Sequence, residues 1–199
     1  MLAVVFIVRA GGKVDEVGLT AYITDQSAML IFASTLAIVG VTLILRALDA
    51  LPEPPPLASW RRTAAFVVAC TLLCWGGQQA ITWLQQWVGL EWTEQEMVAK
   101  NLASDGWVFF TLAIVIGAPV GEELVFRCLG YAALRPWTRP VAALLTAFLF
   151  AVVHGNPTAT FLSVWIALTC TIAYEKTGRF AAPMIVHAAN NGAAVAFSL

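Results

Sequence analysis

Six apolar stretches, separated by short connections, constrain this chain more than any other feature of its sequence. A helix needs about 20 residues to cross the hydrocarbon core of a bilayer, and only the fourth stretch falls clearly short of that length. Hydrophobic residues make up 60% of the chain and charged residues 12%, whereas about a quarter of a soluble domain is charged. The sequence therefore predicts an all-α polytopic transmembrane helix bundle with about six spans. The stretches are Ala28–Leu48, Thr63–Val88, Trp107–Leu134, Val141–His154, Thr158–Glu175 and Phe180–Leu199.

Charge on the five connections alternates. The first, third and fifth carry arginine or lysine, the second is acidic, and the fourth is uncharged. Because cytoplasmic loops of membrane proteins are enriched in Lys and Arg, the odd-numbered connections are predicted to be cytoplasmic and both termini to face outward. The expected location is the cell membrane, as a multi-pass protein of a bacterial inner membrane. The basic residues are Arg46, Arg61, Arg62, Arg135, Arg139, Lys176 and Arg179.

Residues outside the spans give fewer indications. Met1–Val8 is apolar but too short to span a bilayer and lacks the order of a secretory signal, so we expect either an interfacial segment or the remnant of a longer first helix. Glu91–Asp105 mixes acidic and apolar side chains, which favours an interfacial or re-entrant segment. The four cysteines lie in or beside apolar runs and are interpreted as core hydrophobes without a disulfide. They are Cys70, Cys74, Cys128 and Cys170.

Two adjacent carboxylates, Glu122 and Glu123, interrupt the third stretch and are followed by Arg127. A charged side chain in the hydrocarbon core costs roughly 3 kcal/mol or more, so the pair predicts a partner and a function. Glu123 and Arg127 are four residues apart and can form an ion pair within one helix. Glu122 lies about 100° around the helix and is not committed to that pair. Pro119 is expected to open the backbone hydrogen-bond ladder one turn earlier.

The two histidines of the chain also lie in apolar stretches. His154 ends the fourth stretch, and His187 in the sixth shares a helix face with Asn191 at i+4. At about 1.5 Å per residue, Glu122, His154 and His187 lie roughly 20, 22 and 12 Å from the cytoplasmic ends of their helices, and the asparagine roughly 18 Å. These depths fall in the middle of a core about 30 Å thick. The sequence therefore predicts one shared site within the membrane.

A buried glutamate and a histidine can activate a water molecule together, with the carboxylate accepting the proton. A second histidine and an asparagine amide can supply donors to a developing oxyanion. The same atoms could instead hold zinc, since Glu122, His154 and His187 offer two nitrogens and one oxygen. The HExxH helix of many zinc proteases is absent. No serine or cysteine stands out as a nucleophile near these residues, and Phe150 is interpreted as a packing residue.

Three motifs in the second half of the chain together resemble the signatures of the CPBP intramembrane proteases. They are Glu122-Glu123-x-x-x-Arg127, Phe150-x-x-x-His154 and His187-x-x-x-Asn191. This family comprises the type II CaaX prenyl endopeptidases and the bacteriocin-processing or self-immunity proteins of the abortive-infection group. The resemblance runs from about Val108 to the C-terminus. It divides the chain into N-terminal membrane helices with an interfacial segment, residues 1–106, and a catalytic helical core, residues 107–199.

The resemblance implies an endopeptidase with its active site inside the membrane. Glu122 would activate water with His154, and a histidine and an asparagine of the sixth stretch would stabilise the oxyanion. The substrates would be membrane-associated, either CaaX-type prenylated proteins or bacteriocin and leader peptides. Family members are described both as metalloproteases and as metal-free glutamate proteases, so zinc stays an alternative. The implied catalytic residues are Glu122, His154, His187 and Asn191, and the implied supporting residues are Glu123 and Arg127.

Two other functions are compatible with buried glutamate and histidine. A proton-coupled transporter would use them as a relay, but the inverted repeat or paired broken helices of many transporters are not evident in the sequence. A non-catalytic immunity or scaffold protein would lack a motif residue, and none is lacking. The expected partners are a peptide or protein substrate and the lipid bilayer. The sequence has no basic patch or arm, so no nucleic-acid partner is expected.

Overall fold

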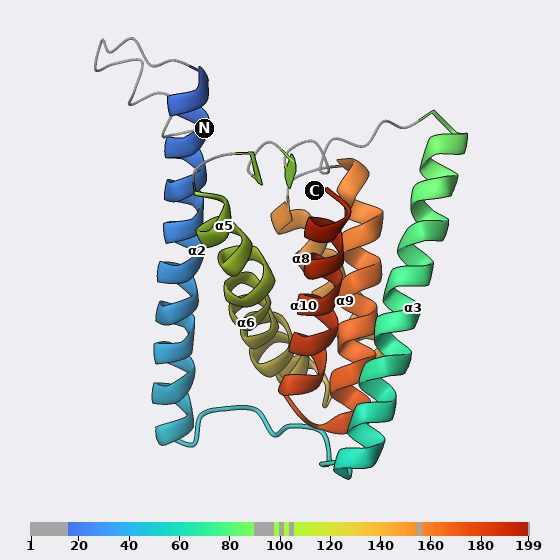
Figure 1. Ribbon diagram of the computed structural model, residues 1–199. Coiled ribbons are helices and arrows are strands. Elements are labelled where there is room, and N and C mark those ends of the chain that lie inside the picture. Colours follow the sequence, from blue (N-terminus) through green and yellow to red (C-terminus); the bar gives the residue numbers. More distant parts are fainter. Residues whose placement is uncertain (1–15, 90–97, 100–101, 104–105, 155–156, 199) are drawn as a thin grey trace.

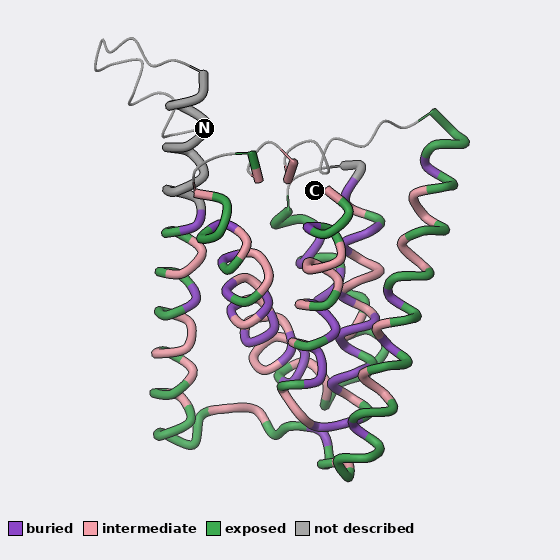
Figure 2. The backbone as a smooth tube through the Cα atoms, in the orientation of Figure 1, coloured by how far each residue is buried: buried purple, intermediate pink, exposed green. Residues whose placement is uncertain are grey.

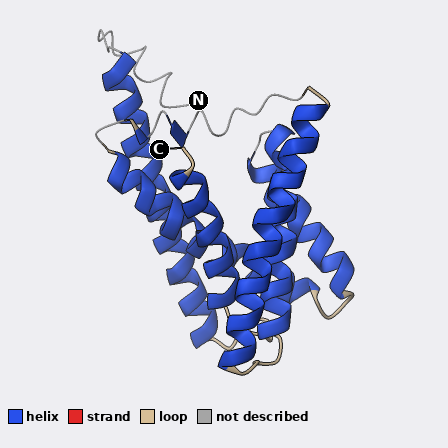
Figure 3. Ribbon diagram, turned by 45° about the vertical axis from the view of Figure 1, so that its right-hand side comes forward, coloured by secondary structure: helices blue, strands red, loops and turns tan. Residues whose placement is uncertain are grey.

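The computed structural model describes residues 16–89, 98–99, 102–103, 106–154 and 157–198 (Figure 1). These residues form helices joined by loops and turns, and they contain no strand (Figure 3). The expectations for Met1–Val8 and for most of Glu91–Asp105 lie outside the described residues. The helical elements are α2 (Glu16–Ala47), α3 (Trp60–Trp87), α5 (Trp107–Leu112), η1 (Ala113–Gly117), α6 (Ala118–Glu123), η2 (Leu124–Tyr131), α7 (Ala132–Leu134), α8 (Arg139–His154), α9 (Pro157–Thr177) and α10 (Ala181–Ala196).

Every predicted apolar stretch corresponds to a helix or to one continuous run of helical segments. The run from α5 to α7, called the glutamate helix below, has the predicted bounds Trp107–Leu134. It is one of three helices in the described part that are long and apolar enough to cross a membrane, together with Ala28–Ala47 and Trp60–Trp87. Arg139–His154 is a shorter apolar helix. The all-α transmembrane class is confirmed, and the count of six spans stays a prediction.

The long helices α2 and α3 form two outer sides of the bundle (Figure 1). α2 packs against α5, η1 and α6, whereas α3 packs against α9 and α10. α8 packs against α9 and η2, and α10 contacts η1 and α6. The glutamate helix and α10 are therefore held together in the interior of the bundle (Figures 1 and 2).

Many of the buried residues are small, and many of the large apolar side chains are exposed. Ala113, Ala151 and Ala173 are buried, whereas large apolar side chains such as Leu36 and Trp83 are exposed. Figure 2 shows exposed residues along the outer sides of α2 and α3 and buried residues in the middle of the bundle. Small residues let helices approach closely in lipid, where large apolar side chains can face hydrocarbon. The burial pattern thus agrees with a protein that folds in a membrane.

Three of the cysteines pack together. Cys70 and Cys74 of α3 and Cys170 of α9 form a buried cluster with alanine and valine side chains. The fourth, Cys128, is half-buried, and all four are free thiols. The interpretation of the cysteines as core hydrophobes without a disulfide is confirmed.

Residues 48–59, 135–138 and 178–180, which carry or adjoin the basic residues of the first, third and fifth connections, lie at the same end of the bundle (Figure 1). The first residues of α2 and the last residues of α10 lie at the opposite end. This is the arrangement that the alternation of charge predicts for helices that cross a bilayer. The assignment of the basic end to the cytoplasm stays a prediction.

The turn between α9 and α10 requires a glycine. Gly178 has φ +62°, and a Cβ at this position would lie 2.3 Å from the carbonyl oxygen of Pro55. The N–H of Ala58 donates to the Thr177 carbonyl at 2.9 Å, and the Arg179 guanidinium donates back to the Ala58 carbonyl at 3.0 Å. The connection between α2 and α3 is therefore anchored to this turn.

Glu175 of α9 fixes the turn between the glutamate helix and α8. Its carboxylate accepts hydrogen bonds from Arg135 Nε at 2.7 Å and from the Tyr131 hydroxyl at 3.1 Å. Arg139 Nη1 lies 3.2 Å from the second carboxylate oxygen. The hydrogen bond to Glu175 raises the pKa of the Arg135 guanidinium. These contacts join the basic ends of three helices.

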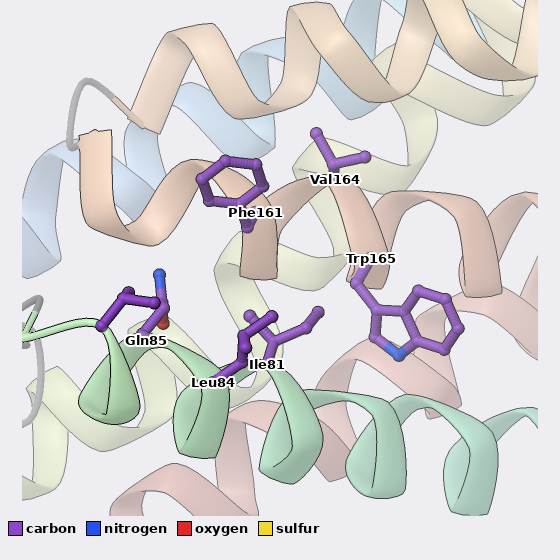
Figure 4. A pocket seen from close by; sticks show the side chains of 7 residues that line it. Ile81, Leu84, Gln85, Phe161, Val164 and Trp165 are labelled. Atoms are coloured by element: carbon purple, nitrogen blue, oxygen red, sulfur yellow. The ribbon is translucent and has the colours of Figure 1, made fainter.

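An apolar groove of about 400 Å³ opens between α3 and α9 (Figure 4). At one side of it the indole N–H of Trp165 donates to the Leu73 carbonyl at 3.2 Å. The predicted site residues do not line this groove, which therefore belongs to a different part of the bundle. The lining residues are Ile81, Leu84, Gln85, Val88, Phe161, Val164 and Trp165.

Candidate active site

The glutamate helix changes its hydrogen-bond pattern on both sides of the two glutamates. The π-helical segments η1 and η2 flank α6, which ends with the carboxylate pair. The N–H of Ala118 donates to the Ala113 carbonyl five residues back, and Pro119 has no N–H. The Ile114 carbonyl therefore lacks a donor from its own helix. Pro119 has the effect predicted for it, and π-helical turns of this kind are frequent at functional sites.

Asn191 of α10 supplies the missing donor. Its Nδ2 lies 2.8 Å from the Ile114 carbonyl oxygen. This contact uses one of the two N–H bonds of the side-chain amide and leaves the second. The neighbouring Asn190 contacts α3 instead, where its Oδ1 lies 3.8 Å from Cys74 Sγ. Of the two adjacent asparagines, the one selected from the sequence is thus the one that contacts the glutamate helix.

Glu123 is fully buried and contacts two partners. Arg127 Nε lies 3.0 Å from its Oε2, an ion pair that is close but is not aligned as a hydrogen bond. His187 Nδ1 lies 2.9 Å from its Oε1. Arg127 is buried as well and donates from Nη2 to the Ala167 carbonyl of α9 at 2.9 Å. The ion pair predicted from the i,i+4 spacing is present, and it extends to two further helices.

Glu122 lies on the other side of His187. Its Oε2 is 3.8 Å from His187 Nε2, which is too long for a direct hydrogen bond. This oxygen is buried and has no hydrogen-bond partner among the residues that the structure describes. The Glu122 side chain as a whole is 30% exposed, whereas Glu123 is 0% exposed. His187 therefore lies between an engaged carboxylate and one that is left to bind water or another ligand.

Phe150 of α8 packs against the charged and ionisable groups of the site. The Arg127 guanidinium lies 5.1 Å from the centre of its ring. The ring centres of His154 and His187 lie at 4.5 and 5.8 Å, and Phe126 meets it edge-on at 5.1 Å. Phe150 is a packing residue, as the sequence predicts, and its packing orders both histidines and the arginine.

His154 is exposed at the end of α8. Its Nδ1 lies 2.7 Å from the Phe150 carbonyl oxygen, so Nδ1–H donates to its own helix and Nε2 is the second ring nitrogen. Within the described residues, no hydrogen bond joins His154 to Glu122. The structure thus brings Glu122, Glu123 and His187 into direct proximity, and it links His154 to them through the Phe150 ring.

The predicted metal ligands do not gather as a set. Within the described part of the chain, the donor atoms that lie within 4.8 Å of one another belong to Glu123, Cys170 and His187. Glu122 and His154 are not in this group. The group fits a divalent cation poorly, because Arg127 already neutralises Glu123 and His187 Nδ1 is bonded to the same carboxylate. These contacts leave the group little capacity to bind a metal ion.

Cys170 is the neighbour of the site that sequence reasoning missed. This thiol belongs to the cluster with Glu123 and His187. Its Sγ donates to the Pro183 carbonyl at 3.6 Å in a fully buried position. The spacing of residues along α9 contains no signal for this contact, which depends on how α9 crosses α10. The burial is typical of a structural thiol, not of a nucleophile.

Comparison with models of known protein families identifies the C-terminal part of the chain. Residues 104–193 match the family described as Type II CAAX prenyl endopeptidase Rce1-like. The match contains all three motifs, and it ends within α10. No curated protein and no solved structure matches the chain. The match over residues 104–193 supports the resemblance to the CPBP family that the three motifs carry, and the matched Rce1-like family consists of membrane-embedded proteases.

Proposed function

We propose that this protein is an intramembrane endopeptidase in which Glu122 activates the attacking water. The observation that carries the proposal is the buried Oε2 of Glu122, which lacks a hydrogen-bond partner among the described residues. Glu123, its neighbour in the sequence, is engaged by Arg127 and His187 and cannot take that role without losing them. A carboxylate beside an imidazole in a desolvated site is suited to general base catalysis.

The reaction begins when Glu122 accepts a proton from water and the water oxygen attacks the peptide carbonyl carbon. A C–O bond forms, and the carbonyl electron pair moves to its oxygen. The C–N bond then breaks, and the departing amine takes the proton from the Glu122 carboxyl group. The products are a carboxylic acid and an amine, and no further reactant is needed. General base catalysis of this kind contributes about 10²- to 10⁴-fold to a rate.

His187 and Asn191 are assigned to the oxyanion. Donation from His187 Nε2 requires a proton on both ring nitrogens, and Glu123 supplies the counter-charge at Nδ1. Asn191 retains one amide N–H beyond its bond to Ile114. Donors of this kind are typically worth about 3–4 kcal/mol each in the transition state. His154 Nε2 is assigned to orient the water beside Glu122.

The substrate class follows from the family, and its finer identity is part of the proposal. CaaX-type prenylated proteins are one candidate, and bacteriocin or leader peptides are the other. The catalytic core is residues 107–199, and residues 1–106 supply the preceding membrane helices. We place the protein in a bacterial inner membrane as a multi-pass protein with its basic end in the cytoplasm.

The test is cleavage of membrane peptides by the purified full-length chain in liposomes. A prenylated CaaX peptide, the same peptide without the prenyl group and a leader peptide are compared by mass spectrometry. Glu122→Gln is expected to lower kcat by about 10²- to 10⁴-fold, and His154→Ala is expected to lower it as well. Glu53→Gln, the same change on the exposed connection between α2 and α3, is the matched control. Cleavage that survives both site substitutions would overturn the assignment.

A further inference from the structure

Thr35 of α2 contacts the glutamate helix at the same π-helical segment that Asn191 contacts. Its hydroxyl donates to the Gly117 carbonyl at 2.9 Å, a buried hydrogen bond between residues 82 positions apart. Gly117 ends η1, and in helical geometry its carbonyl accepts from the N–H four or five residues later, at Gly121 or Glu122. Thr35 therefore bonds to the turn that leads into Glu122.

The two helices approach each other closely at this point. A Cβ added to Gly121 would lie 3.0 Å from the Thr35 hydroxyl oxygen and 3.5 Å from the Thr35 Cα. A Cβ on Gly117 would lie 3.2 Å from the side chain of Ile31. Glycine at both positions lets α2 approach the backbone of the glutamate helix, as small residues do between membrane helices. The close approach is what brings the hydroxyl within reach of the carbonyl.

The acceptor of this hydrogen bond lies in a different helix, which distinguishes Thr35 from Thr42 and Thr146. Thr42 of the same helix donates to the Ile38 carbonyl at 2.8 Å, and Thr146 donates to the Ala142 carbonyl at 2.8 Å. In both cases the hydroxyl donates to the backbone carbonyl four residues earlier in the same helix, as is usual for threonine in apolar helices. Thr35 instead bonds a different helix, one turn before the catalytic carboxylate.

We propose that Thr35 is a positioning residue of the active site. Its hydrogen bond to Gly117 sets the orientation of the turn that carries Glu122, so α2 belongs to the catalytic unit although it lies outside residues 104–193. The inference rests on the proposed role of Glu122 as the base. Misplacing a reacting group by about 1 Å can cost on the order of 100-fold in rate.

The test compares Thr35→Val, Thr35→Ser and the matched control Thr42→Val in the liposome cleavage assay. Thr35→Val is expected to lower kcat by about 10-fold or more while KM changes little, because the base is displaced and the substrate contacts are kept. Thr35→Ser restores the hydroxyl and most of the rate, and Thr42→Val behaves as the wild type. Equal kcat values for Thr35→Val and Thr42→Val would overturn the proposal.

A second measurement separates this proposal from the proposed function. The rate at which dicyclohexylcarbodiimide labels the Glu122 carboxyl is followed by mass spectrometry, without any substrate. Thr35→Val and Gly121→Ala are each expected to change that rate several-fold, and Thr42→Val is expected to leave it unchanged. If Glu122 labels equally in Thr35→Val and wild type, Thr35 does not position it. Altered labelling in a chain that cleaves no peptide would sustain the positioning and refute the peptidase assignment.

Discussion

Two sides of His187 differ in how completely their charges are paired. On the inner side, Glu123, Arg127 and the Ala167 carbonyl form a buried chain of contacts that joins α6, η2, α9 and α10. On the open side, Glu122 is partly exposed, and its buried oxygen has no hydrogen-bond partner within the described residues. The difference separates stability from chemistry: the paired carboxylate holds helices together, whereas the unpaired one is available to a water molecule.

The largest expected effect comes from removing the inner charge. Glu123→Gln leaves Arg127 buried without a counter-ion, and breaking a buried pair in this way typically costs about 3–5 kcal/mol of folding free energy. Glu122→Gln removes a group whose contact with His187, at 3.8 Å, is too long for a direct hydrogen bond, and its expected cost is below about 1 kcal/mol. Unfolding of both variants in the same detergent measures the contrast. Equal losses of stability would show that the two carboxylates do not differ in role.

A smaller effect is expected where α10 contacts the glutamate helix. Asn191→Leu removes the donor to the Ile114 carbonyl, and a buried carbonyl left without a partner costs about 1–3 kcal/mol. Asn190→Leu is the control at the adjacent position, and its loss is expected to be smaller because its contact with Cys74 is long. Unfolding and kcat are measured for both variants. A larger loss from Asn190→Leu would contradict the role assigned to Asn191.

The smallest expected effect is that of metal removal. Because Arg127 and His187 engage Glu123 from both oxygens, the cluster with Cys170 has little capacity for a cation. Treatment with a zinc chelator is expected to leave both cleavage and the unfolding temperature unchanged. Elemental analysis of the same sample serves as the check. Stoichiometric zinc, together with loss of cleavage on chelation, would place the open side of His187 in a metal site.

Features that depend on one helix could be predicted from the sequence. Apolar length predicts most helix bounds, although α2 begins at Glu16 and not at the predicted Ala28. The pairing of Glu123 with Arg127 follows from the i,i+4 spacing. The effect of Pro119 on the backbone follows from its missing N–H. Each of these needs only the periodicity of a helix and the chemistry of one residue.

Features that depend on how helices cross could not be predicted. The spacing of the sixth stretch places His187 and Asn191 on one face, but it does not specify that Nδ1 meets Glu123 while Nε2 faces Glu122. Cys170 approaches the site only because α9 and α10 pack together. Thr35 and Thr42 look equivalent in the sequence, and only the contact with Gly117 tells them apart.

The carboxylate of Glu175 has a mechanical consequence for the helices that carry the site. Glu175 binds Arg135, Tyr131 and Arg139 and so fixes the glutamate helix and α8 to each other at their shared turn. Glu122 lies about 13 residues from Arg135, roughly 20 Å along the glutamate helix. If the angle between the glutamate helix and α8 changes, the resulting displacement is smallest at the basic end and increases toward Glu122 and His154. A change in the angle between these helices would therefore alter most the space between Glu122 and His154, the two residues proposed to activate water.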